Sequence, residues 1–192
     1  MRDNENTFIL AGVLFVITAV VSLMLAFSNM VTADKIAQNT KKAENEARIA
    51  VMPEATEFKF FRSYREGVVT EIQHAIKGGE KIGWCVSVAP NGYGGAIEFI
   101  VGIDSEFKTT GIKIVNMSET PGLGAKAGEE NFSSQFDGKN ASNGLSVIKS
   151  GTPKDNEILA ISGATVTSTA IKEGINAAVE AIKGGIRDEK IH

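Results

Sequence analysis

Hydroxyl-bearing residues cluster near the C-terminal end of the chain, where the segment SGATVTS over 162–168 contains four of them. The segment stands between a short apolar run and the start of a long amphipathic pattern that predicts a helix. The first N–H groups of a helix lack internal partners and carry partial positive charge, so an anion such as a phosphate is favoured there. A plain helix cap is the alternative interpretation, although one cap needs only one hydroxyl.

Two further segments combine glycines with polar or apolar side chains. ETPGLG over 119–124 follows a predicted strand, and NGYGG over 91–95 lies between two predicted strands. Gly122 and Gly124 would let the backbone approach a flat ring closely, and Leu123 could cover its face. Taken alone, the first segment is more typical of a Pro-Gly turn, and the second also fits a plain strand connection.

Composition argues against several other kinds of site. Cys85 is the only cysteine, so the chain alone forms no disulfide and cannot hold an iron–sulfur cluster, which needs several thiolates. Only two histidines are present, which argues against a histidine-rich zinc or copper site, and we expect no metal site. The net charge of −3 gives no general attraction to polyphosphates, so we expect no nucleic-acid partner.

The residues around these segments predict a mixed fold. Gly78-Gly79 has the composition of a tight hairpin turn. A short helix is predicted near 131–136, and a long helix over 166–183 should bury one face and end at Gly184-Gly185. Alternating apolar and polar residues predict four strands over 68–77, 81–89, 96–103 and 111–117. The pattern predicts an α+β fold, an antiparallel sheet with flanking helices.

The N-terminal region predicts a membrane anchor. Seventeen of the twenty residues over 8–27 are apolar, which is enough for one helical crossing of about 30 Å. A cleaved signal peptide is the alternative, but this run exceeds the roughly 7 to 15 residues of a signal core. The flanking charges do not decide the orientation. We divide the chain into an N-terminal tail over 1–7, a transmembrane helix over 8–28, a linker or stalk helix over 29–53 and a domain over 54–192.

At the clustered motifs the sequence resembles a known family. Residues 162–168 resemble the flavinylation motif of the FMN-binding domain family, and 119–124 resemble its ETPGLG loop. That family includes one subunit of the Rnf complex and one subunit of the sodium-translocating NADH:quinone reductase. The motifs match in order and spacing over nearly the whole chain. The length and the glycine-rich loop at 91–95 favour the Rnf branch of the family.

The resemblance implies a cofactor and the residues that hold it. FMN would be joined to Thr165 through a phosphoester by a dedicated Mg-dependent flavin transferase. Tyr93 would border the flavin, and Lys126 is more simply a solvated lysine than a group that stabilises the reduced flavin. The residues implied to bind the cofactor are Ser162, Gly163, Ala164, Thr167, Ser168, Glu119, Thr120, Gly122, Leu123, Gly124 and Tyr93.

The resemblance also implies a membrane-anchored electron-transfer subunit of an ion-translocating ferredoxin:NAD oxidoreductase (Rnf) complex, with no complete activity alone. Its partners would be the other membrane subunits, its N-terminus would be cytoplasmic and its C-terminal domain would lie outside the cell membrane. Alternatives are the related subunit of the NADH:quinone reductase, a stand-alone extracytoplasmic flavoprotein, and a membrane-tethered binding or assembly module without flavin. We expect Trp84 and Cys85 in core or half-buried positions and His74 facing solvent.

Overall fold

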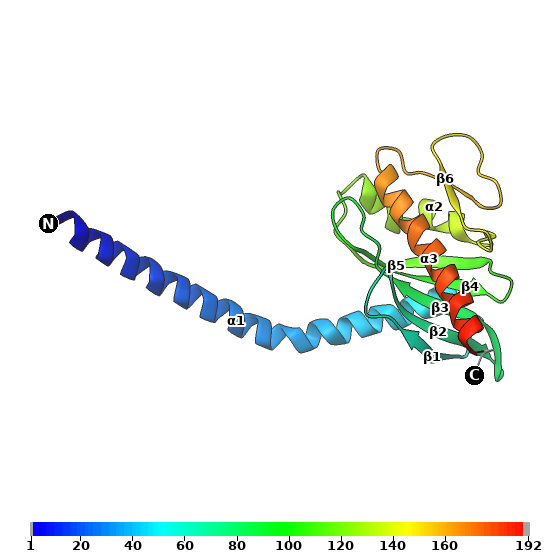
Figure 1. The fold of residues 1–192 in the computed structure, drawn as a ribbon, viewed down its shortest axis with the longest axis horizontal. Coiled ribbons are helices and arrows are strands. Elements are labelled where there is room, and N and C mark those ends of the chain that lie inside the picture. The colour runs from blue at the N-terminus through cyan, green and yellow to red at the C-terminus, as the bar shows by residue number, and fades with distance from the viewer. Residues whose placement is uncertain (1, 190–192) are drawn as a thin grey trace. The chain divides into compact units, whose positions relative to one another are not determined.

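The computed structural model describes residues 2–189, and the chain divides into two compact units after Lys42. The helices and strands, all but β7 labelled in Figure 1, are α1 (Arg2–Val51), β1 (Glu57–Ser63), β2 (Val69–Lys77), β3 (Glu80–Val88), β4 (Ile97–Asp104), β5 (Thr109–Met117), α2 (Glu130–Ser133), β6 (Ser146–Ile148), β7 (Glu157–Leu159) and α3 (Thr165–Glu189). Two short 3-10 helices, η1 (Gly124–Gly128) and η2 (Ser134–Phe136), flank α2.

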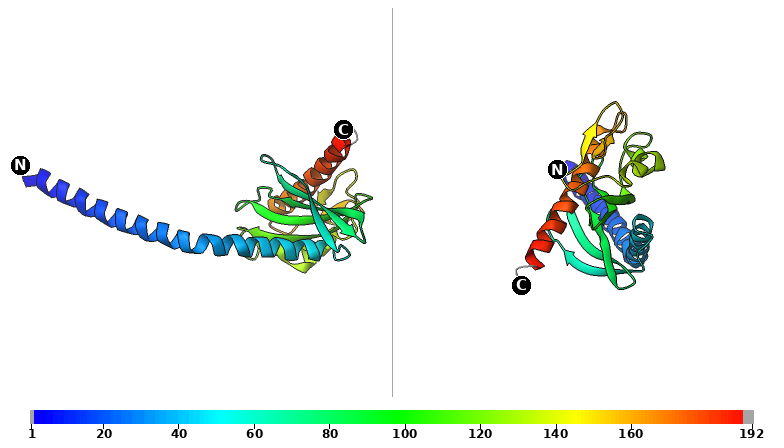
Figure 2. Two further views of the ribbon diagram at one scale, coloured as in Figure 1. Left: turned by 90° about the horizontal axis from the view of Figure 1, so that it is seen from below. Right: turned by 90° about the vertical axis from the view of Figure 1, so that its right-hand side faces the viewer.

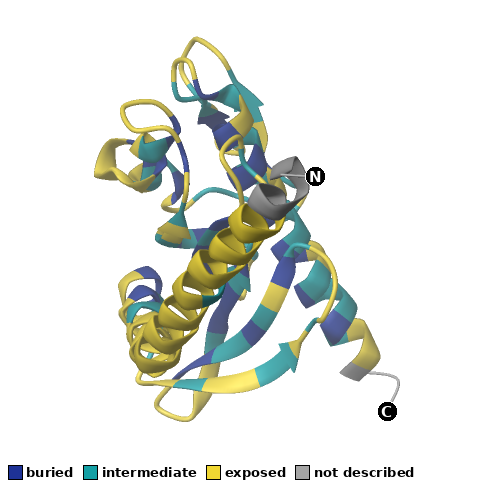
Figure 3. Ribbon diagram, turned by 90° about the vertical axis from the view of Figure 1, so that its left-hand side faces the viewer, coloured by how far each residue is buried: buried dark blue, intermediate teal, exposed yellow. Residues whose placement is uncertain are grey.

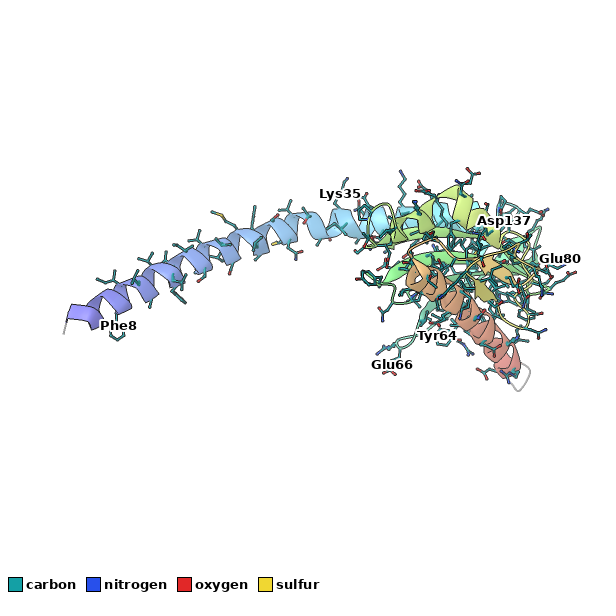
Figure 4. The ribbon with its side chains drawn as sticks, turned by 90° about the horizontal axis from the view of Figure 1, so that it is seen from above. Phe8, Lys35, Tyr64, Glu66, Glu80 and Asp137 are labelled. Atoms are coloured by element: carbon teal, nitrogen blue, oxygen red, sulfur yellow. The ribbon has the colours of Figure 1, made fainter. Side chains whose placement is uncertain are left out.

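The first part of α1 is apolar and exposed. From Phe8 to Lys42 nearly every side chain lies on the surface (Figure 3), and Phe8 itself is 76% exposed. Figure 4 shows the Phe8 and Lys35 side chains projecting from the helix. The helix contains a stretch that is long and apolar enough to cross a membrane. One continuous helix therefore covers the residues of the predicted span and most of the predicted stalk.

The sheet has five antiparallel strands in the order β1-β2-β3-β4-β5. The four predicted strands are confirmed as β2 to β5. Gly78 and Gly79 both have positive φ angles, 59° and 90°, which the tight turn between β2 and β3 requires. The strand β1 was not predicted, because this edge strand is largely exposed and has a bulge between Phe60 and Arg62 that interrupts its alternation.

Helices cover both faces of the sheet, as Figure 2 shows. Trp84 and Val86 point into the larger core, which they share with Ile171 and Ile175 of α3. Cys85, between them in sequence, points to the opposite face because successive strand side chains alternate. There Ala47 and Val51 at the end of α1, and Met52 directly after it, pack with Ala75, Cys85 and Ile100. The predicted α+β architecture and the core positions of Trp84 and Cys85 are confirmed.

The long helix α3 continues past the glycine pair that was predicted to end it, so that prediction is wrong. A Cβ atom on Gly185 would lie 2.7 Å from the Phe61 ring, whereas one on Gly184 would meet open space. Gly185 thus permits close packing inside the helix instead of ending it. The Phe61 ring also stacks on His74 at 4.4 Å, so His74 is half-buried and the solvent-facing prediction is wrong.

The connection from β5 to α3 brings the ETPGLG segment to the start of α3. The predicted short helix is confirmed as α2 and η2. The strands β6 and β7 form a separate parallel pair. Each has three residues, which is too short for a pattern of alternation to be read from sequence. Ile158 of β7, Phe132 and Phe136 join the larger core and hold this connection against the sheet.

Candidate functional site

A cavity of about 620 Å³ opens where three segments of the second unit meet. These are the 91–95 loop, the ETPGLG loop over 119–124 and the first turn of α3. The volume lies in the range of about 300–1,000 Å³ that is typical of small-molecule and cofactor sites. The lining residues are Tyr93, Glu119, Thr120, Leu123, Gly124, Gly163, Ala164, Thr165, Val166 and Thr167.

Three residues of the predicted set lie outside this lining. Ser162 is exposed, Gly122 has a φ of +77° in a turn, and Ser168, in the first turn of α3, is fully buried. The lining also includes Val166, which was not predicted to contact the cofactor. Its place in the first helical turn, directly after Thr165, was the available signal.

The hydroxyls of 162–168 differ in their partners. Thr167 Oγ1 donates a hydrogen bond of 2.9 Å to Glu119 Oε2. Ser168 Oγ donates to the Ala164 carbonyl and accepts from the Ile161 N–H, both at 3.0 Å. Thr165 is half-buried, lines the cavity and has no hydrogen-bond partner for its hydroxyl within residues 2–189. Thr165 therefore offers the cavity an unengaged hydroxyl.

The first turn of α3 has no side-chain cap. Ala164 stands directly before the helix and carries no acceptor in its side chain. The backbone N–H groups of Thr165, Val166 and Thr167 donate to no group in the described part of the chain, and Ser168 N–H is the first to bond within the turn, to the Ala164 carbonyl at 3.1 Å. The structure thus does not support the plain capping interpretation. Bare N–H groups of this kind favour an anion.

Glu119 connects the three segments that form the cavity. Its side chain is 7% exposed. Oε1 accepts hydrogen bonds from the N–H groups of Tyr93 at 2.8 Å and Gly94 at 3.1 Å, and Oε2 accepts from Thr167. Both oxygens of Glu119 therefore have hydrogen-bond partners within the protein. A buried polar side chain is tolerated when its oxygens are satisfied in this way.

The glycines of the two loops pack against this carboxylate. A Cβ atom on Gly92 would lie 2.2 Å from Glu119 Oε1, and one on Gly124 would lie 2.3 Å from Glu119 Oε2. Contacts this short are not tolerated, so any side chain at either position would displace Glu119. The Gly124 backbone therefore closely approaches a buried side chain of the protein itself, in addition to any ligand that it approaches.

Apolar side chains border the cavity. Tyr93 is 77% exposed, Val166 54% and Leu123 44%. Lys126 is exposed and lies outside the lining. A second cavity of about 250 Å³ shares Thr165 and Val166 with the first. The site as a whole combines a bare helix start, an unengaged hydroxyl and an apolar border.

Comparisons with known proteins agree with this geometry. Residues 92–180 match the FMN-binding domain family. The G subunit of the Na(+)-translocating ferredoxin:NAD(+) oxidoreductase complex of Acetobacterium woodii is 36% identical, over 93% of this chain and 92% of that protein. The G subunit of the proton-translocating ferredoxin:NAD(+) oxidoreductase complex of Clostridium ljungdahlii is 30% identical, over 94% of each chain.

A solved structure shares the fold. The crystal structure of NqrC from Shewanella oneidensis superposes with a TM-score of 0.54 over 74% of each chain, at 17% sequence identity. The relatives from Acetobacterium and Clostridium have higher sequence identity and coverage than this structure, so the chain is more closely related to them than to NqrC. The chain therefore belongs to the FMN-binding domain family and, within it, to the G subunits of ion-translocating oxidoreductase complexes.

Proposed function

We propose that this protein is a membrane-anchored electron-transfer subunit of an ion-translocating ferredoxin:NAD oxidoreductase complex, with FMN joined to Thr165 through a phosphoester. One observation carries the assignment of the attachment residue. Among the four hydroxyls of 162–168, that of Thr165 lines the cavity without a partner in the described chain, whereas those of Thr167 and Ser168 are engaged. Ser162 lies outside the lining.

The residues present fit FMN in both charge and polarity. An ester at Thr165 would place a negatively charged phosphodiester beside the bare N–H groups of Thr165, Val166 and Thr167, where an anion is favoured. Leu123, Tyr93 and Val166 offer apolar surface for the flat ring. When bound, FMN supplies the electron transfer, and the protein holds, orients and shields it.

The apolar part of α1 is proposed as the membrane anchor, spanning residues 8–28. We place the N-terminus in the cytoplasm and the FMN-binding domain, over 54–192, outside the cell membrane. The partners are then the other membrane subunits of the complex, and a flavin transferase acts during maturation. Recovery of the chain in the membrane fraction, and copurification with several integral membrane subunits, test these statements.

Covalent flavin is tested by coexpressing the full chain with a flavin transferase. A denatured gel should show flavin fluorescence at the mass of the chain, and the intact mass should rise by one FMN less one water. Thr165→Val should abolish both signals. Thr70→Val is the control, because Thr70 donates a hydrogen bond to the Ser87 carbonyl and does not line the cavity.

Two results would contradict this proposal at different levels. Label retained in Thr165→Val would show that another residue carries the flavin, while the flavoprotein class would stand. The second result is a wild-type chain that stays unlabelled although the same transferase labels a known acceptor. This result would contradict the flavoprotein class and favour a membrane-tethered module without flavin.

A further inference from the structure

We infer that Glu119 is the positioning residue of the FMN site: its carboxylate fixes the 91–95 loop against the first turn of α3 and so holds Thr165 and the bare amides in place. This inference rests on the proposed function only for the effect that it predicts on flavin attachment. Its structural basis, the three hydrogen bonds to Glu119, does not depend on any cofactor.

The hydrogen bonds that Glu119 makes within the protein indicate that it acts on the site through other residues. Both carboxylate oxygens accept bonds from within the protein, and the side chain is 7% exposed. The backbones of Gly92 and Gly124 approach it closely, since a single added carbon at either position would reach its oxygens. Glu119 is therefore held on several sides and connects segments that lie far apart in the sequence.

The start of α3 depends on this connection because it has no cap. A side-chain cap ordinarily satisfies a first-turn N–H group and fixes the helix start. Here Ala164 cannot do so, and the hydrogen bond from Thr167 to Glu119 ties the first turn to the rest of the domain instead. Thr165 lies two positions earlier in the same turn. Loss of the bond would loosen the turn that presents the Thr165 hydroxyl and the bare N–H groups.

Four substitutions separate geometry from bulk stability. Glu119→Gln keeps the shape, with a carbonyl oxygen that can accept from Tyr93 and Gly94 and an amide that can donate to Thr167 Oγ1. Glu119→Asp shortens the side chain by one methylene, so it cannot span both partners. Thr167→Val removes the hydroxyl at nearly constant volume, and Thr167→Ser restores it.

The experiment measures the initial rate of flavin attachment by intact mass during coexpression with the transferase. Wild type, Glu119→Gln and Thr167→Ser should be labelled at similar rates. Glu119→Asp and Thr167→Val should be about tenfold slower, the ratio expected for the loss of one buried hydrogen bond. Thr70→Val again serves as the control, because it loses a side-chain hydrogen bond outside the cavity.

A second measurement needs no flavin. Hydrogen exchange of the unlabelled full chain in detergent should show protected N–H groups at Tyr93 and Gly94 in wild type and in Glu119→Gln. In Glu119→Asp these two groups should exchange about tenfold faster, while the strand amides of β3 keep their protection.

The outcomes distinguish this inference from the proposed function. An unlabelled wild type would contradict the proposed function alone, and the exchange measurement would still decide the role of Glu119. A labelled wild type with unchanged rates in both Glu119→Asp and Thr167→Val would overturn the inference. If Glu119→Asp does not fold, the comparison of Thr167→Val with Thr167→Ser decides, because the Thr167 hydroxyl donates to Glu119 and Thr167→Ser restores that donor.

Discussion

Thr165 and Thr167 lie two positions apart in the first turn of α3 and line the same cavity, yet only Thr167 has a partner for its hydroxyl in the described part of the chain. Thr167 donates to Glu119 at 2.9 Å, across 48 positions of sequence. Successive residues of an α-helix are rotated by about 100°, so side chains two positions apart point in directions about 200° apart and meet different surroundings. One hydroxyl therefore secures the helix start, and the other stays available for chemistry.

Replacing Glu119 with Gln should raise the midpoint potential of the bound flavin. Reduction adds negative charge to the cavity, and a buried carboxylate in its wall opposes that charge. Removing the charge while keeping the shape should shift the potential positively, on the order of tens of millivolts. Spectroelectrochemical titration of the labelled protein measures this shift. Glu106→Gln, an exposed carboxylate outside the cavity lining, is the control, and an equal potential in both variants would disprove the effect.

Gly124→Ala should destabilise the domain and slow flavin attachment. Its Cβ would lie 2.3 Å from Glu119 Oε2 and 2.7 Å from Thr167 Oγ1, so their hydrogen bond must lengthen or break. The expected loss in free energy of unfolding is about 2–3 kcal/mol. Urea denaturation of the full chain in detergent measures it.

Gly122→Ala is the matched control for this prediction. Gly122 has a φ of +77° but open space around it, so the substitution brings backbone strain without a clash. We expect a loss of about 1 kcal/mol. A larger loss for Gly122→Ala than for Gly124→Ala would show that packing against Glu119 is not the dominant constraint.

Gly184 and Gly185 should respond in opposite directions to alanine. Gly184 lies within α3 with open space around it, so Gly184→Ala should stabilise the chain by about 0.5–1 kcal/mol. In Gly185→Ala the added carbon would meet the Phe61 ring at 2.7 Å, and displacement of the ring should give a net loss of about 1 kcal/mol. Thermal unfolding compares the two, and a gain in both would contradict the packing assigned to Gly185.

Cys85 should be inert in the folded protein. Burial raises the pKa of the Cys85 thiol to about 12, although the nearby Arg48 guanidinium acts in the opposite direction. The reactive species is the thiolate, so a thiol reagent at pH 8 should modify Cys85 slowly in buffer and rapidly in urea. Fast modification of the folded chain at this pH would be incompatible with its burial.

The same raised pKa predicts a pH dependence of stability. In the unfolded chain the thiol ionises near its ordinary value of 9.0, whereas in the folded chain it stays protonated until about pH 12. The unfolded state therefore binds fewer protons between these values, and the contribution of Cys85 to stability falls as the pH rises above about 9. Cys85→Ala should reduce this alkaline loss in urea titrations at pH 8 and pH 10.

Local sequence patterns predicted the elements that bury one face. The strands β2 to β5 and the helix α3 emerged because alternation and helical periodicity record which side chains face the core. The edge strand β1 was missed because it buries little. The end of α3 was misplaced because Gly185 reflects contact with Phe61, a residue of β1 that no local pattern connects to it.

By itself, the sequence determined the membrane-length apolar stretch, the strands of the antiparallel sheet and the motifs of the three segments, because each depends on residues that are neighbours in the chain. That these segments form one site was implied by the resemblance to the family. Only the tertiary structure decided which hydroxyl lining the cavity is unengaged and why Gly92 and Gly124 are glycines. Both answers depend on Glu119, whose partners come from two other segments. Hydrogen bonds between distant segments are set by the packing of the whole domain and leave no periodic trace in the sequence.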